Sequence, residues 1–135
     1  MTGVFNLELA RLYYYLFQKT EQNFTILYAL DGYDEISLTG PAKAFSNKGE
    51  DIISPQDFGL HRLEATEIIG GSEVASSAAI FMNVLENRCT EAQHNVVCAN
   101  AAMAIANVKN ISPVEGFEKA KDSLASGSAL AAYKA

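Results

Sequence analysis

Long hydrophobic runs are missing from this sequence. No apolar run approaches the roughly 20 residues that a membrane-spanning helix needs, so we expect no membrane partner. The first residues, Met1-Thr2-Gly3-Val4, lack the basic and then apolar pattern of a secretory signal, and we expect a cytoplasmic protein. Hydrophobic residues make up 49% and charged residues 19% of the 135, which is typical of a single globular domain, residues 1–135.

Basic residues are also scarce. Ten Lys and Arg face sixteen Asp and Glu, which gives a net charge of −6. A chain of this charge repels phosphate backbones, so we expect no nucleic-acid partner. The acidic excess lies in the first half, because residues 1–70 carry −5 and residues 71–135 carry only −1.

Cysteine and histidine are few and scattered. Cys89 and Cys98 lie nine residues apart, which matches no zinc-binding spacing and forms no C-x-x-C pair. One helix carrying both would place them on opposite faces, and we expect two reduced thiols. His61 and His94 have no Ser or Cys arrangement beside them that suggests a catalytic triad, so we expect structural or surface roles for both.

The first half of the chain predicts a mixture of helix and short strands. An apolar stripe recurs at helical spacing over residues 6–19, and residues 24–30 form a short apolar run typical of a buried strand. A helix followed by a buried strand favours a parallel or mixed sheet with helical cover. Three further short strands are predicted, of which the last two form a hairpin: residues 36–39, 42–46 and 51–54. Ser54-Pro55 predicts a short helix that Gly59 ends.

The second half predicts helices. It holds 15 of the chain's 20 alanines, counting from Gly71 onward. Ser72 is the expected cap of a first helix, in which one face is apolar (Val74, Ala78, Phe81, Met82 and Leu85). Capping boxes at Thr90 and Ser112 predict a buried helix to about residue 107 and another helix ending near Gly127. The expected fold is α/β: a small mixed β-sheet with flanking helices, continuing into an Ala-rich helical C-terminal half.

The densest polar cluster is D-G-Y-D-E-I-S, residues 31–37, directly after the buried strand. In open α/β sheets ligands bind beyond the carboxyl ends of strands. Asp34 and Glu35 are adjacent carboxylates, and Mg²⁺ prefers one or two carboxylates together with waters and substrate phosphates. Spacing alone favours a solvated acidic turn over a metal site. Gly70-Gly71-Ser72 before a helix is compatible with a phosphate cradle, but the pattern favours a tight turn and a helix cap.

Several ordered blocks resemble anthranilate phosphoribosyltransferase. Residues 31–41, D-G-Y-D-E-I-S-L-T-G-P, resemble the D-G-x-D-E-I-S/T signature of that family. Residues 54–59 resemble its P-E-D-F-G segment, and Gly70-Gly71 followed by residues 78–80 resembles its G-G-x-x-x-x-N-A-x-I stretch, with Ser77 at the family's Asn. Residues 95–104 resemble its buried N-A-A helix. The resemblance runs from about residue 3 to residue 133.

The resemblance implies a reaction and a metal. The family transfers phosphoribosyl from phosphoribosyl diphosphate to anthranilate in tryptophan biosynthesis. In the family the D-E pair binds the magnesium that holds the diphosphate, so the resemblance assigns Asp34 and Glu35 as metal ligands and Mg²⁺ as cofactor. It assigns no catalytic or substrate-binding residue to this chain.

Some family features have no counterpart in the sequence. The glycine-rich phosphate loop G-T-G-G-D, the K-x-x-N-R-A segment and the N-terminal helical domain do not occur. The chain therefore resembles the C-terminal part of the family's large α/β domain, and we expect it to be inactive alone. A non-catalytic interaction or regulatory module derived from the family is the alternative, and a homo-oligomer is compatible with either.

Overall fold

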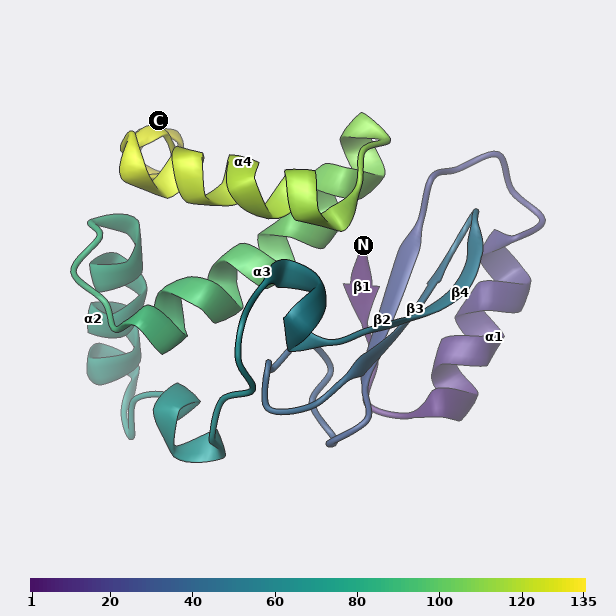
Figure 1. Ribbon diagram of the computed structural model, residues 1–135, viewed down its shortest axis with the longest axis horizontal. Coiled ribbons are helices and arrows are strands. Elements are labelled where there is room, and N and C mark those ends of the chain that lie inside the picture. The colour runs from purple at the N-terminus through teal and green to yellow at the C-terminus, as the bar shows by residue number, and fades with distance from the viewer.

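The chain forms a four-stranded sheet followed by a helical layer, as the computed structural model of residues 1–135 shows (Figure 1). The predicted α/β class is confirmed. The elements, in chain order, are β1 (Thr2–Gly3), α1 (Leu7–Phe17), β2 (Thr25–Ala29), β3 (Ala42–Ser46), β4 (Gly49–Ile53), the 3₁₀ turns η1 (Pro55–Phe58) and η2 (Ala65–Ile68), α2 (Val74–Leu85), α3 (Glu91–Lys109), α4 (Pro113–Ala125) and α5 (Ser128–Lys134).

The sheet is mixed and β2 lies inside it. The strand order is β1-β2-β3-β4, with β1 parallel to β2 and the other two pairs antiparallel. Four of the five β2 residues are buried, because helices cover both faces of this strand. The hairpin β3–β4 turns over Asn47-Lys48, and Gly49 follows with a φ of +113°, a conformation that favours glycine.

Two hydrophobic cores lie on opposite faces of the sheet. The smaller one, between α1 and the sheet, is formed by Val4, Ala10, Phe24, Ile26 and Phe45. The larger one joins the other face to α3 and α4, and it includes Leu27, Ile36 and Leu38 from the sheet side. Figure 1 shows α1 on one side of the sheet and α3 with α4 on the other. The alternating side chains of β2 supply both cores.

Local signals place most helix ends where the sequence predicts them. Thr90 and Ser112 cap α3 and α4 with reciprocal capping boxes. Ser54 and Pro55 begin η1, and Gly59 ends it in the left-handed conformation. The first helix of the second half is capped by Glu73, so the prediction of Ser72 as its cap is wrong by one residue. Cys89 precedes α3, so the two cysteines do not share a helix.

The predicted strand over residues 36–39 is wrong. The segment is buried, but its backbone pairs with side chains and a distant loop. Thr39 N donates to Ser37 Oγ, and Leu63 N donates to the Leu38 carbonyl. Leu38 has a φ of +61°, a left-handed value that ends any extended run.

The apolar face predicted for α2 is also not the buried one. Val84 is the buried residue of this helix, whereas Val74 is 88% exposed and Phe81 is 49% exposed. Figure 1 shows α2 at the end of the molecule remote from the sheet, beside the beginning of α3. Periodicity predicts which face of a helix is apolar, but it does not predict what covers that face. No helix of the structure is long and apolar enough to cross a membrane.

Candidate functional site

The polar cluster after β2 forms an irregular loop, residues 31–40, which we call the acidic loop. Its first five residues are exposed and its last five are buried. Asp34 and Glu35 lie on the exposed side, and their carboxylates make no hydrogen bond and no ion pair within the chain. The structure therefore leaves both predicted metal ligands free to bind a cation.

Asp31, the first carboxylate of the acidic loop, has a different role. Its Oδ2 accepts a hydrogen bond from Ser37 Oγ at 2.9 Å and another from Thr39 Oγ1. Gly40 lies against the same side chain, since a Cβ at that position would stand 3.0 Å from Asp31 Oδ2. Asp31 thus closes the loop on itself, which its sequence position beside Asp34 and Glu35 does not reveal.

The backbone around Asp34 and Glu35 is held from two sides. On one side, β1 approaches so closely that a Cβ on Gly3 would stand 1.6 Å from the Asp34 carbonyl oxygen. On the other side, the Asn100 side chain of α3 pairs with the backbone of Ile36. Ile36 is 2% exposed and belongs to the larger core. The loop therefore presents two free carboxylates on a fixed backbone.

The donor set at this point fits a hard cation in part. Two adjacent carboxylates are within the number that Mg²⁺ takes from a protein when waters and phosphates complete its coordination. No group of three or more His, Cys, Asp or Glu side chains is arranged to hold a metal ion. The chemistry of the loop is thus that of a partial site.

The glycine pair before α2 packs tightly against that helix. A Cβ on Gly71 would stand 2.4 Å from Ser76 Oγ and 2.4 Å from Ser77 N, and Ser77 Oγ donates to the Gly71 carbonyl. Gly71 is therefore required for the close approach of the turn to the helix. This geometry favours the interpretation of Gly70-Gly71 as a turn.

His94 and Cys98 face each other one turn apart on α3. Both ring nitrogens of His94 lie 3.9 Å from Cys98 Sγ. Burial raises the pKa of the Cys98 thiol to about 11, with Lys121 acting in the opposite sense. The thiol is fully buried and protonated at neutral pH, so it is a core residue rather than a nucleophile.

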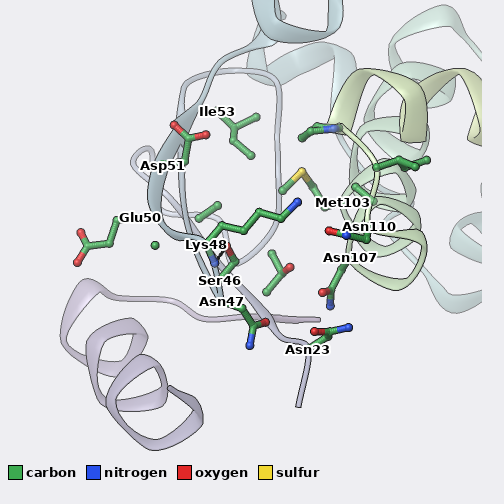
Figure 2. Close-up of a pocket in the computed structure, with 16 residues that line it drawn as sticks. Asn23, Ser46, Asn47, Lys48, Glu50, Asp51, Ile53, Met103, Asn107 and Asn110 are labelled. Atoms are coloured by element: carbon green, nitrogen blue, oxygen red, sulfur yellow. Dashed lines mark hydrogen bonds between the residues drawn. The ribbon is translucent and has the colours of Figure 1, made fainter. Parts of the chain in front are cut away.

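A cavity of about 420 Å³ lies between the β3–β4 hairpin and the end of α3, as Figure 2 shows. The Lys48 side chain extends across it toward Met103 and Asn110. Glu50 and Asp51 also line the cavity, but their carboxylates point away from Lys48 in Figure 2, and the Glu50 carboxylate is paired with Lys43 at 2.6 Å. Asn23 precedes β2 whereas the acidic loop follows it, which places the cavity at the opposite end of that strand. This cavity was not predicted from the sequence.

The comparison with protein families identifies the class. The family described as "Glycosyl transferase family, a/b domain" matches residues 1–130. The chain belongs to that family.

Curated proteins similar to this chain are named anthranilate phosphoribosyltransferase. Those from Flavobacterium psychrophilum and Flavobacterium johnsoniae are 56% and 60% identical over 134 residues, which is 99% of this chain and 41% of each relative. The relative from Bacteroides thetaiotaomicron is 44% identical over 135 residues. The resemblance seen in the sequence is confirmed, and the chain spans about two fifths of the length of the curated relatives it matches.

Solved structures agree on the fold. Anthranilate phosphoribosyltransferase from Thermus thermophilus superposes with a TM-score of 0.85 at 24% identity, covering 95% of this chain and 39% of that one. The Saccharomyces cerevisiae protein, in complex with PRPP and Mg, gives a TM-score of 0.80 at 23% identity over 95% of this chain and 37% of that one.

Proposed function

We propose that this chain supplies a magnesium-binding half-site to an anthranilate phosphoribosyltransferase, with Asp34 and Glu35 as the protein ligands. It corresponds to the C-terminal part of the family's large α/β domain. The observation that carries the proposal is the pair of exposed, unpaired carboxylates in a block that matches the family signature. The relatives' shared name and the yeast complex with PRPP and Mg support it.

Five residues of the acidic loop have defined roles in this proposal, two as metal ligands and three in holding the shape of the loop. Asp34 and Glu35 would hold Mg²⁺, which would supply positive charge for the diphosphate of phosphoribosyl diphosphate. Magnesium, when bound, neutralises the negative charge that builds on the leaving diphosphate. Asp31, Ser37 and Thr39 keep the loop closed, so that the two carboxylates face solvent. An acidic chain needs such a cation to approach an anionic substrate, because its own charge of −6 repels diphosphate.

This chain by itself is expected to be inactive. A phosphate group needs backbone amides or cations around it, and no glycine-rich G-T-G-G-D block occurs in the 135 residues. The acidic loop carries three carboxylates and no lysine, arginine or histidine. We therefore expect no phosphoribosylanthranilate from the purified chain with Mg²⁺, phosphoribosyl diphosphate and anthranilate. Formation of that product above the level of a no-protein control would contradict this expectation.

The second candidate is a non-catalytic interaction module. It is favoured by α2, which exposes two large apolar side chains, Val74 at 88% and Phe81 at 49%. An exposed apolar helix face is typical of a surface that pairs with another chain.

Isothermal calorimetry separates the two candidates. The metal half-site predicts weak heat with phosphoribosyl diphosphate that requires Mg²⁺. The interaction module predicts no heat with either ligand and a stable dimer in light scattering. Heat that is independent of Mg²⁺ would contradict the half-site, since the acidic loop has no cationic side chain to bind an anion directly.

A further inference from the structure

One side chain of α3 is paired with the backbone next to the metal half-site. Asn100 Nδ2 donates to the Ile36 carbonyl at 2.8 Å, and Ile36 N donates to Asn100 Oδ1 at 2.9 Å. A residue in an extended strand presents its N–H and C=O to the same neighbour. The Asn100 amide therefore makes the two hydrogen bonds that a neighbouring strand would make with Ile36, although the two residues are 64 positions apart in the sequence.

The Asn100 amide is itself held in place. Nδ2 also donates to the carbonyl of Val96, at 3.0 Å, one turn earlier in the same helix. The amide is the group that meets this geometry, because it offers one acceptor and two donors in a fixed plane. Aspartate at this position would bring a carboxylate oxygen against two carbonyl oxygens, and alanine would leave the Ile36 amide and carbonyl unpaired.

The pairing reaches the metal ligands through one peptide bond. The N–H of Ile36 belongs to the peptide unit that joins it to Glu35, so Asn100 fixes the direction of the chain at that point. Gly3 fixes the other end, because the Asp34 carbonyl occupies the space of a side chain there. The two carboxylates between these anchors have no partner of their own.

We propose that Asn100 is a positioning residue for the carboxylates of Asp34 and Glu35: it fixes the backbone that carries them and so sets the metal affinity of the half-site. This inference rests on the proposed function. Groups behind metal ligands typically change metal affinity by about 10- to 100-fold when mutated, because they orient the ligands before the ion arrives.

The test measures metal affinity and local hydrogen bonding in the same chain. Mn²⁺ has the oxygen-ligand preference of Mg²⁺, and it broadens the NMR signals of amides near it. Titrating the ¹⁵N-labelled chain with Mn²⁺ is expected to broaden residues around 34–36 first. In Asn100→Ala we expect an apparent dissociation constant about tenfold higher and exchange of the Ile36 amide about tenfold faster.

A matched control lies on the same helix. Asn107 is two turns further along α3, makes no side-chain hydrogen bond and lines the cavity instead. Asn107→Ala is expected to leave Mn²⁺ affinity unchanged. If Asn100→Ala does not fold, Asn100→Ser takes its place, since a hydroxyl can still donate to the Val96 carbonyl and adds no charge beside the half-site. All titrations are run under conditions in which circular dichroism shows the same folded spectrum for the native chain and the variants. A difference in Mn²⁺ affinity then does not come from unfolding of a variant.

The outcomes separate this inference from the function on which it rests. Weaker Mn²⁺ binding in the Asn100 variant, with Asn107→Ala unchanged, supports the positioning role. Equal binding by the native chain and the Asn100 variant overturns it and leaves the half-site standing. A native chain that shows no Mn²⁺ broadening around residues 34–36 overturns both.

Discussion

The helices α2 and α3 are both rich in alanine and apolar side chains, but they differ in what covers them. α3 buries six residues, forms the most extensive contact between elements with α4, and reaches the acidic loop through Asn100. α2 buries Val84 alone and has no comparable contact with any other element. The same composition therefore supports a core helix at one position and an exposed helix at the other.

This difference shows where the stability and the site of the chain reside. The sheet, α3 and α4 form one packed unit that holds the backbone of Asp34 and Glu35. Substitutions in that unit are expected to reduce the free energy of unfolding, whereas substitutions on the exposed face of α2 are expected to change it little.

The largest effect is expected at the close contact of α3 with α4. A Cβ on Gly116 would stand 2.4 Å from the backbone carbonyl oxygen of Ala102, and no side-chain rotation relieves a clash with backbone. Gly116→Ala is expected to lower the free energy of unfolding by about 2 kcal/mol, because overpacking exceeds the gain of about 1 kcal/mol in helix propensity. Urea denaturation measures it.

Gly70→Ala is the matched control for Gly116→Ala. No atom lies within 4 Å of the added Cβ at Gly70, and its backbone is not left-handed. Its free energy of unfolding should stay within about 0.5 kcal/mol of the native value. An equal loss in both variants would mean that the contact of α3 with α4 is no tighter than the turn before α2.

A smaller effect is expected at the start of α4. Ser112 Oγ accepts from Glu115 N at 3.2 Å, and Glu115 Oε2 accepts from Ser112 N at 2.9 Å. Ser112→Ala removes the first of these bonds and should cost about 1 kcal/mol of unfolding free energy at pH 7. Thermal unfolding followed by circular dichroism measures it, and an unchanged midpoint would show that the cap adds no stability.

The same cap makes stability depend on pH. Hydrogen bonds from the Ser112 backbone and then from its side chain hold the pKa of Glu115 below its usual 4.5. The charged form therefore stabilises the folded chain above pH 4.5, and this contribution is lost as the pH falls through the lowered pKa. Glu115→Gln should show a smaller decrease in unfolding free energy between pH 5 and acid than the native chain, in titrations at about half-unit steps. Parallel curves for the two proteins would contradict this.

The smallest effect is expected on α2. Val74 is 88% exposed, so Val74→Ser removes almost no buried apolar surface. The free energy of unfolding should change by less than about 0.5 kcal/mol. A loss above about 1 kcal/mol would show that this face of α2 is covered in solution.

Structural features that depend on residues close together in the chain could be predicted from the sequence. The capping boxes at Thr90 and Ser112, the hairpin turn and the Ser54-Pro55 helix start are all confirmed, because each depends on contacts three or four residues apart. The buried strand β2 followed from its uninterrupted apolar run. The adjacency of Asp34 and Glu35 was likewise visible, and their assignment as metal ligands stays a proposal.

Contacts between residues far apart in the chain could not be predicted from the sequence. Residues 36–39 have a strand-like pattern, but their partners are Asn100 and Leu63, which no local pattern reveals. The role of Asp31 depends on hydroxyl groups six and eight residues away in a loop of irregular shape. Asn100 stands in the N-A-A block of residues 95–104, but that block does not indicate a contact with Ile36.

The half-site is tested most directly by removing its two carboxylates and measuring Mg²⁺-dependent heat with phosphoribosyl diphosphate. The double variant Asp34→Asn with Glu35→Gln is compared with Glu8→Gln plus Glu21→Gln, which removes the same charge at two exposed positions outside the acidic loop. We expect the first variant to lose the heat and the second to keep it. Equal heat in the two variants would contradict the assignment of Asp34 and Glu35 as the metal ligands.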